Sequence, residues 1–434
     1  MGDGVRAQRK ARWTAGGHAA LLALALAVPA THALALPPPE ALLPRAKPVA
    51  TPEFISWVSA LREEALGAGI SATTFDRAFT GILPDPVILE RDAHQPEFAR
   101  PIWEYLDGAV SDLRVENGRA AQARLLAELQ RLELLYGVPK QILVAIWGLE
   151  SSYGNFTGDT NIIQSLATLT FAGRRTDYFR GELINALKIL EARGGSVLLG
   201  SWAGAMGHTQ FMPSSYLAHA VDGDDDGERD IWDNPVDALA STASYLQQSG
   251  WEPGKSWGEA VRLPERFDYA LAELTLQRPM SEWAGLGVTR LDGSMLELTG
   301  AQGRDPSAIL VPAGHEGMAF IVGTNFRALL AYNNSTAYAL GIGLLSDRIA
   351  GAHPLPARWP RDTRPLTRTE REELQRHLLA EGQPVGEVDG VIGIRTREAI
   401  RVVQQRLGLV PDGFPDDTLL ARLRARADER GGGP

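Results

Sequence analysis

Two proline-rich stretches set the limits within which this chain can fold. One runs from Pro37 to Pro52 and the other from Pro354 to Pro365. Proline fixes its own φ and removes a backbone donor, so such stretches interrupt regular helices and strands. About 300 residues lie between them, which is more than the usual single domain. The predicted divisions are a large region at 52–350, a linker at 351–365, a small domain at 366–425 and a flexible tail at 426–434.

The N-terminal residues have the pattern of an export signal. Basic residues at Arg6 to Arg12 precede the apolar run Ala19–Val28, and small residues follow at Ala33–Ala35. A basic segment, a short apolar segment and an A-x-A-like site are typical of a secretory signal peptide. We therefore expect a signal peptide at 1–35, a Pro-rich leader at 36–51 and a periplasmic location. If the signal is not cleaved, it could tether the chain to a membrane.

The absence of cysteine excludes several kinds of site. None of the 434 residues is Cys, so disulfides, thiolate metal sites, a cysteine nucleophile and an acylated lipoprotein anchor are all excluded. The formal net charge is −10, and the part after the signal has no long basic run. Nucleic acid is therefore not an expected partner.

Hydrophobic periodicity predicts a mainly α fold. From Phe54 to about Gly250, apolar residues recur three or four positions apart, as in Leu125, Leu129, Leu132 and Leu135. Around 257–323 the pattern changes, because the short apolar runs 308–312 and 318–322 flank a Gly-containing turn. That predicts a β-containing insertion before helix resumes. The C-terminal domain repeats an Asp-Gly turn followed by Thr, at Asp389 and Asp412, which predicts a small three-helix unit.

Glu150 is the strongest candidate for chemistry. It ends the apolar run Ile142–Leu149 and is followed by Ser151-Ser152-Tyr153-Gly154. A carboxyl at the end of a buried helix loses hydration, so its pKa should rise and it could donate a proton to a leaving oxygen. The simpler alternative is an acidic residue that faces water. A standard glycosidase needs a second carboxylate, and Asp177 and Glu182 are the downstream candidates, although sequence alone cannot place them.

An acidic loop predicts a calcium site. In the segment 222–230, oxygen ligands at loop positions 1, 3, 5 and 9 with glycine at position 6 match the front of an EF-hand loop. The predicted ligands are Asp222, Asp224, Asp226, the main-chain carbonyl of Glu228, and Asp237, with Asp233 as the alternative last ligand. So many acidic groups repel one another unless a cation neutralises them. The alternative is a solvated acidic loop.

Together these segments resemble the membrane-bound lytic murein transglycosylase B family over about residues 52–350. The resemblance rests on five segments, namely Gln95–Phe98, Trp103–Tyr105, Ile146–Gly154, Gly204–Tyr216 and Ala331–Ser335. The C-terminal domain is similar to a peptidoglycan-binding module. This resemblance implies a mainly α protein, with a lysozyme-like α+β catalytic domain, a small β-containing insertion and a three-helix C-terminal domain.

The resemblance also implies the chemistry of the site. Glu150 falls on the family's single catalytic acid and base, which cleaves the glycosidic bond between N-acetylmuramic acid and N-acetylglucosamine to leave a 1,6-anhydro end. The residues that fall on positions lining the sugar groove are Tyr105, Ser201, Gln210, Tyr245, Tyr332, Asn333 and Tyr338. The acidic loop falls on a structural calcium site. Catalysis would need no cofactor.

The sequence is compatible with three functions. The leading one is a lytic transglycosylase of cell-wall turnover that acts on peptidoglycan glycan strands as a monomer, with other cell-wall enzymes as further partners. A hydrolytic muramidase would need a second carboxylate opposite Glu150. A non-catalytic peptidoglycan-binding scaffold would have no need for an acid in an apolar pocket.

Overall fold

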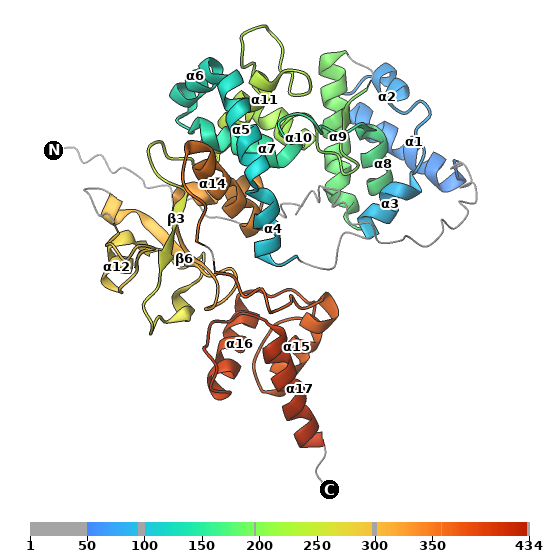
Figure 1. Ribbon diagram of the computed structural model, residues 1–434. Helices are drawn as coiled ribbons and strands as arrows, with labels where there is room; N and C mark the ends of the chain where they lie inside the picture. Colours follow the sequence, from blue (N-terminus) through green and yellow to red (C-terminus); the bar gives the residue numbers. More distant parts are fainter. Residues whose placement is uncertain (1–49, 94–99, 195–196, 297–301, 357, 432–434) are drawn as a thin grey trace, which may run out of the picture.

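The computed structural model describes residues 50–93, 100–194, 197–296, 302–356 and 358–431. The predicted signal peptide at 1–35, nearly all of the leader at 36–51 and the segment Gln95–Phe98 lie outside the described residues. The chain forms a helical body, a small sheet inserted in that body between α11 and α13, and a C-terminal helical domain (Figure 1).

The helical body contains thirteen helices and one short two-stranded sheet within the described residues. They are α1 (Pro52–Gly67), α2 (Ala72–Ala78), α3 (Pro86–Ala93), α4 (Ile102–Ala109), α5 (Asp112–Arg124), α6 (Leu126–Tyr136), α7 (Lys140–Ser151), β1 (Thr160–Asn161), α8 (Ile162–Ala172), α9 (Thr176–Arg193), β2 (Leu199–Gly200), α10 (Pro213–His219), α11 (Pro235–Gln248), α13 (Thr324–Tyr332) and α14 (Thr336–Ala350). The predicted mainly α fold is confirmed.

The body has two hydrophobic cores. One is built by α1–α3 and α8–α10, and the other by α4–α7, α11, α13 and α14. Tyr332, at the end of α13, packs against both cores. The predicted periodicity around residue 130 is only partly right, because Leu129 and Leu132 are buried whereas Leu135 is exposed. The pattern also crosses a break in the helix at Leu125.

Helix α7 lies at the centre of the second core. Its residues from Ile142 to Ser151 are all buried, as expected of a helix that is apolar on every side. Helices α5, α11 and α14 pack around it. Among the described residues, no single helix is both long and apolar enough to cross a membrane. Helices α6 and α7 reach that length and apolarity only when taken together, and the chain bends by 113° between them.

The insertion is a five-stranded antiparallel sheet in the order β4-β6-β7-β3-β5. Its elements are β3 (Gly258–Arg262), a 3-10 turn at Tyr269–Leu271, β4 (Arg278–Pro279), α12 (Met280–Gly285), β5 (Thr289–Arg290), a second 3-10 turn at Gln302–Arg304, β6 (Pro306–Leu310) and β7 (Ala319–Val322). Alternate residues of β7 face opposite sides of the sheet. Phe320 and Val322 join the core of the body, whereas Ala319 and Ile321 pack with Trp283 of α12. The insertion is thereby anchored to the body.

The C-terminal domain is formed by α15 (Arg368–Ala380), α16 (Ile394–Arg406) and α17 (Asp417–Gly431) around a small core of its own. Thr367 and Glu370 form a capping box at the start of α15. Helix α17 extends to Gly431, so the tail predicted to begin at residue 426 is helical as far as 431. Arg426, Ala427, Glu429 and Arg430 are all residues that favour helix, which accounts for its continuation.

The linker predicted at 351–365 packs against the body. The ring of Trp359 lies 6.4 Å from that of Trp103 in α4. The guanidinium of Arg361 donates two hydrogen bonds, of 2.8 and 3.0 Å, to the carboxylate of Asp107. A proline-rich segment can lie on a surface in this way because it needs no backbone partners of its own kind.

Candidate active site

Glu150 lies in the last turn of α7, and the chain bends sharply directly after it. Ser152 and Tyr153 have φ values of 49° and 62°, in the left-handed region that ends a helix. The hydroxyl of Ser151 donates to the carbonyl of His208 at 2.5 Å and accepts from the amide of Gly154 at 3.0 Å. These contacts tie the end of α7 to the segment that contains Gln210.

Glu150 is a buried acid with one close polar partner. Its exposed fraction is 9%, and the hydroxyl of Tyr338 donates a hydrogen bond of 2.6 Å to Oε1. Burial raises the pKa of Glu150 to about 7, and the Tyr338 hydrogen bond opposes this shift only in part because it favours the charged form. The carboxyl can therefore give up or take a proton near neutral pH.

Three tyrosines surround this acid. The rings of Tyr332 and Tyr338 are parallel within 4°, with centroids 6.4 Å apart. Burial together with the nearby charge of Glu150 raises the pKa of Tyr105, Tyr332 and Tyr338, so all three keep their hydroxyl protons. Tyr105 comes close because Gly341 of α14 has no side chain, and a Cβ there would lie 3.2 Å from its ring.

Tyr245 extends the aromatic wall away from Glu150. Its ring centroid lies 5.0 Å from that of Tyr332, and its hydroxyl donates to the carbonyl of Ala331 at 3.0 Å. The hydroxyl of Tyr332 in turn donates to the carbonyl of Thr209 at 2.6 Å. The hydroxyl positions of both rings are thus fixed by backbone carbonyls.

Two amide oxygens at the site are buried without a partner. Gln210 has a φ of 52°, and its Nε2 donates to the carbonyls of Thr157 and Gly207 at 2.9 and 2.8 Å. Its Oε1 accepts no hydrogen bond from the described residues, and neither does Oδ1 of Asn333. An unsatisfied buried acceptor costs about 1–3 kcal/mol. A ligand that brings N–H or O–H donors would remove this penalty.

Ser201 has a different environment. Its hydroxyl accepts from the amide of Ala205 at 3.0 Å and closes the turn that precedes Gly207. A Cβ on Gly158 would lie 2.2 Å from the backbone of Gly200 and 2.6 Å from the amide of Ser201, so the chain passes close to this turn only because residue 158 is glycine. The environment of Ser201 suggests that it shapes the site through the backbone.

No second carboxylate lies beside Glu150 among the described residues. Burial and Tyr338 are the only causes of the shift in the pKa of Glu150. Glu182 instead accepts from the hydroxyl and the amide of Ser214 at 2.6 and 2.9 Å, at the start of α10. Asp177 is exposed in the first turn of α9. Neither forms a hydrogen bond with Glu150 or contributes to the shift in its pKa.

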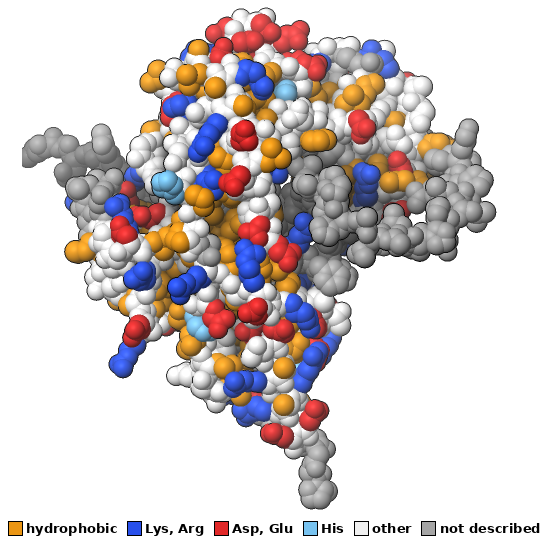
Figure 2. All heavy atoms as spheres, in the orientation of Figure 1, with side chains coloured by type: hydrophobic (Ala, Val, Ile, Leu, Met, Phe, Trp, Pro, Cys, Tyr) orange, Lys and Arg blue, Asp and Glu red, His pale blue; other side chains and the backbone are white. Residues whose placement is uncertain are grey.

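The acidic loop between α10 and α11 brings carboxylates together. Oxygens of four aspartates lie within 4.8 Å of one another, and they belong to Asp222, Asp224, Asp226 and Asp237. Figure 2 shows acidic side chains gathered at the top of the molecule, where this loop protrudes in Figure 1. Asp233 lies outside the group, so Asp237 supplies the fourth carboxylate. The side chain of Glu228 is exposed and also lies outside it.

Sequence reasoning missed the contacts that hold the end of α7 in place. Trp147 Nε1 donates to Nδ1 of His208 at 3.2 Å, and Nη1 of Arg114 donates to the carbonyl of Gly148 at 2.8 Å. The hydroxyl of Tyr153 donates to the carbonyl of Arg114 at 2.6 Å. A single histidine or arginine carries no local signal for such a role, because each partner lies elsewhere in the chain.

Two family models match this chain. The transglycosylase SLT domain matches residues 53–347, and a peptidoglycan binding domain matches residues 367–423. The chain is 36% identical over 252 residues to the membrane-bound lytic murein transglycosylase B of Escherichia coli strain K12. The matched region covers 54% of this chain. The match spans 64% of the length of that relative, somewhat less than two thirds.

Solved structures resemble the chain over a larger part of its length. SltB3 from Pseudomonas aeruginosa, solved in complex with NAG-anhNAM-pentapeptide, has a TM-score of 0.83 and 50% identity; the match covers 86% of this chain and all of that one. The soluble lytic transglycosylase SltB1 of the same organism has a TM-score of 0.60 and 30% identity, over 68% of this chain and 98% of that one. The lytic transglycosylase Slt35 of E. coli in complex with calcium has a TM-score of 0.58 and 28% identity, over 69% and 93%.

Proposed function

The chain belongs to the transglycosylase SLT domain family and carries a C-terminal peptidoglycan binding domain, and we propose that it is a lytic transglycosylase of peptidoglycan. It cleaves the β-1,4 bond between N-acetylmuramic acid and N-acetylglucosamine without water and leaves 1,6-anhydro ends. Glu150 is its single general acid and base.

The protonated carboxyl of Glu150 first donates its proton to the glycosidic oxygen. The bond from that oxygen to C1 of the muramic acid breaks, the N-acetylglucosamine leaves with a free hydroxyl, and positive charge develops at C1. The C6 hydroxyl of the same muramic acid then attacks C1 and gives its proton to the carboxylate of Glu150. This returns Glu150 to its protonated form, and the reaction consumes no water.

One observation carries this proposal. The pKa of Glu150 is raised to about 7, and no second carboxylate acts on it among the described residues. An acid that must become a base within one turnover works best with a pKa near the working pH. The missing nucleophile is supplied by the substrate itself, because an intramolecular hydroxyl has a high effective concentration. A hydrolytic muramidase would lack its second carboxylate here.

The surroundings of Glu150 support a sugar groove. The unpaired oxygens of Gln210 and Asn333 can accept from the acetamido N–H and hydroxyl groups of the substrate. The rings of Tyr105, Tyr245 and Tyr332 offer apolar faces to sugar rings. We assign Tyr338 a positioning role, because its hydroxyl holds Oε1 of Glu150. SltB3 was solved with glycan-pentapeptide ligands of this kind.

We further propose that the acidic loop binds a structural Ca²⁺. Four carboxylates within 4.8 Å fit a hard cation that prefers oxygen ligands, and Asp237 among them is fully buried. The carbonyl of Glu228 would be a further ligand. The ion would offset the repulsion of the aspartates and hold α10 to α11. Calcium is present in the structure of Slt35.

The enzyme would act on the periplasmic cell wall. The pattern at residues 1–35 supports export, although this segment lies outside the described residues. The domain matched by the peptidoglycan binding model would hold the enzyme on its insoluble substrate. Glycan strands are its proposed partner, with a role in wall turnover.

The proposal is tested by mass analysis of muropeptides released from purified peptidoglycan by the intact enzyme and by Glu150→Gln. We expect products lighter by one water than reducing ends, and only when Glu150 is present. Reducing ends would instead indicate a hydrolytic muramidase. Binding to peptidoglycan without release of any product by the intact enzyme would favour a non-catalytic scaffold.

A further inference from the structure

The C-terminal domain contains two Asp-Gly turns held in the same way. In the first, Oε1 of Gln375 accepts from the amide of Gly390 at 2.8 Å, and its Nε2 donates to Oδ1 of Asp389 at 3.1 Å. In the second, Oε1 of Gln404 accepts from the amide of Gly413 at 2.9 Å, and its Nε2 donates to Oδ1 of Asp412 at 2.7 Å. The two turns are structural equivalents.

Further details support this equivalence. Gly390 and Gly413 have φ values of 73° and 77°. In each turn, Oδ1 of the aspartate also accepts the amide two residues later, at 2.8 Å from Val391 and at 2.9 Å from Phe414. Oδ1 of each aspartate therefore accepts hydrogen bonds within its own turn, whereas Oδ2 accepts none from that turn.

The second turn is already occupied by a peptide segment of the same chain. Oδ2 of Asp412 accepts the backbone amide of His315 at 2.9 Å, and Nδ1 of the same histidine lies 2.7 Å away. The contact leaves Asp412 only 6% exposed. His315 belongs to the loop between β6 and β7, so this turn holds the insertion against the C-terminal domain.

A carboxylate completes the contact at the occupied turn. Glu273 of the insertion is 9% exposed and accepts from Arg397 at 3.0 and 2.7 Å, and from Arg401 at 2.6 Å. Arg397 lies seven positions before Gln404, on the same helix α16. The occupied turn thus recognises a peptide by two features, namely an N–H donor at the aspartate and a carboxylate at the arginine.

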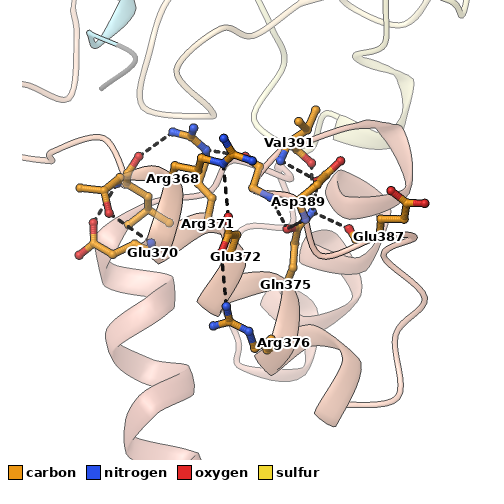
Figure 3. Close-up of polar contacts among 12 residues, drawn as sticks. Arg368, Glu370, Arg371, Glu372, Gln375, Arg376, Glu387, Asp389 and Val391 are labelled. Atoms are coloured by element: carbon orange, nitrogen blue, oxygen red, sulfur yellow. Dashed lines mark hydrogen bonds and ion pairs between the residues drawn. The ribbon is translucent and has the colours of Figure 1, made fainter. Parts of the chain in front are cut away.

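The first turn, here called the open turn, has a corresponding aspartate and arginine in a more exposed setting. Its arginine, Arg368, pairs with Glu372 at 3.3 Å, and this glutamate stands where the second turn has Arg401. Arg368 lies seven positions before Gln375 on α15, and its side chain is 52% exposed. A Cβ on Gly390 would lie 2.9 Å from Cγ of Arg368, so this arginine borders the turn. Among the hydrogen bonds of the described residues, none reaches Oδ2 of Asp389. Figure 3 shows Asp389 between Arg368, at the start of α15, and Gln375, about two turns further along the same helix.

A shallow hollow adjoins the open turn. Asp389 shares it with Val391, Ile394 and Arg395. Val391 is 64% exposed, and Ile394 is exposed as well. Apolar side chains beside an acceptor and a cation suit a short peptide better than a bare sugar, because a peptide combines apolar side chains with N–H donors and carboxylates, whereas sugars present hydroxyls on most of their edges.

We propose that the open turn, formed by Asp389 and Arg368, binds the peptide stem of peptidoglycan. Oδ2 of Asp389 accepts an amide N–H or an amine of the stem, as Asp412 accepts from His315. Arg368 takes a stem carboxylate, as Arg397 takes Glu273. This inference rests on the proposed function, because it assumes that peptidoglycan is the ligand, and it adds which part of peptidoglycan the domain recognises.

The test measures binding of the full chain in a Glu150→Gln background, so that the polymer stays intact. Co-sedimentation is measured with purified peptidoglycan and with the same material after an amidase has removed its peptide stems. Asp389→Asn keeps an oxygen for Val391 and turns the open acceptor into a donor. Arg368→Gln removes the cation. Arg376→Gln is the matched control, because Arg376 lies on the same helix and also pairs with Glu372.

We expect the parent to bind intact peptidoglycan more tightly than stem-free glycan. Asp389→Asn and Arg368→Gln should each weaken binding to intact peptidoglycan about three- to tenfold, as for loss of one charge-assisted hydrogen bond at a surface. Binding to stem-free glycan should not change, and Arg376→Gln should match the parent with both materials. Thermal melting confirms that each variant is folded.

Equal binding of the parent to both materials would overturn the inference, as would parent-like binding by the two test variants. Neither result concerns the proposed function, because cleavage is measured separately with the chain that retains Glu150. Release of anhydro products together with stem-independent binding would leave the function in place and remove only the stem site.

Discussion

The hydroxyl of Tyr338 donates a hydrogen bond of 2.6 Å to Oε1 of Glu150, although the two residues are 188 positions apart in the chain. Tyr338 lies in the first turn of α14, and Glu150 lies in the last turn of α7, which packs directly against α14. The bond fixes one oxygen of the carboxyl and stabilises its charged form. The other oxygen stays available for a proton.

Tyr338→Phe should move the pH dependence of activity upward. The hydrogen bond lowers the pKa of Glu150, so its loss lets burial raise that pKa further. The first step needs the protonated acid, so kcat/KM should fall at a higher pH in the variant than in the parent. The measurement is a kcat/KM–pH profile on soluble glycan strands. A falling limb that stays in place or moves to lower pH would contradict this assignment.

Glu150→Gln should abolish cleavage and stabilise the fold at alkaline pH. The pKa of Glu150 is raised from 4.5 to about 7 by burial, so the folded state holds a proton that the unfolded state has lost. The stability of the parent therefore falls as pH rises from about 4.5 to about 7. The uncharged amide avoids this loss, which should make the variant more stable by about 2–3 kcal/mol at pH 8.

Chemical unfolding of both proteins at pH 4.5 and pH 8 checks the previous prediction. The two proteins should have similar free energies of unfolding at pH 4.5, where the acid is protonated in the folded state and still about half protonated in the unfolded state. An equal difference at both pH values would mean that the effect comes from packing and not from the charge of Glu150.

Asn333→Ala should reduce kcat/KM about ten- to hundredfold with little loss of stability. Oδ1 of Asn333 is buried without a partner, so the free enzyme loses nothing when it is removed. In the complex, the substrate N–H or O–H group that would donate to Oδ1 is then left without a partner, which weakens binding by about 1–3 kcal/mol. Asn334→Ala is the matched control, because this neighbour is exposed. Similar kcat/KM values for the two variants would show that Asn333 does not contribute to substrate binding.

Calcium removal should lower the melting temperature without stopping the chemistry at low temperature. An ion that binds only the folded state stabilises it by mass action. Asp224→Asn should abolish the response of the melting temperature to chelator, because Asp224 belongs to the carboxylate cluster. Asp225→Asn should retain the response, since Asp225 is in the same loop but outside the cluster and its φ of 64° suits asparagine. The measurement is differential scanning calorimetry with and without EDTA. Equal melting curves for the parent under both conditions would show that the loop holds no stabilising calcium ion.

Features that depend on residues close together in the sequence could be predicted from it. The continuous apolar run before Glu150 predicts a buried helix and an acid with a raised pKa, and the structure places Glu150 accordingly. The spacing of the acidic loop predicts the gathering of Asp222, Asp224 and Asp226. The apolar runs at 308–312 and 318–322 predict a pair of strands, found as β6 and β7.

Contacts between distant segments could not be predicted in this way. Strands β4 and β5 have two residues each and exist only because β6 and β3 pair with them. The role of Glu182 depends on Ser214, which lies 32 positions away. The contact between His315 and Asp412 spans 97 positions. None of these pairs leaves a periodic trace in the sequence, because each depends on how packed elements meet.

Cleavage of glycan strands in ¹⁸O-labelled water tests the central claim most directly, because the claim is that the substrate's own hydroxyl replaces water. We predict that Glu150-dependent products carry anhydro ends without the label. Incorporation of ¹⁸O at the new anomeric end, dependent on Glu150, would show that water is the nucleophile and would contradict the single-acid mechanism.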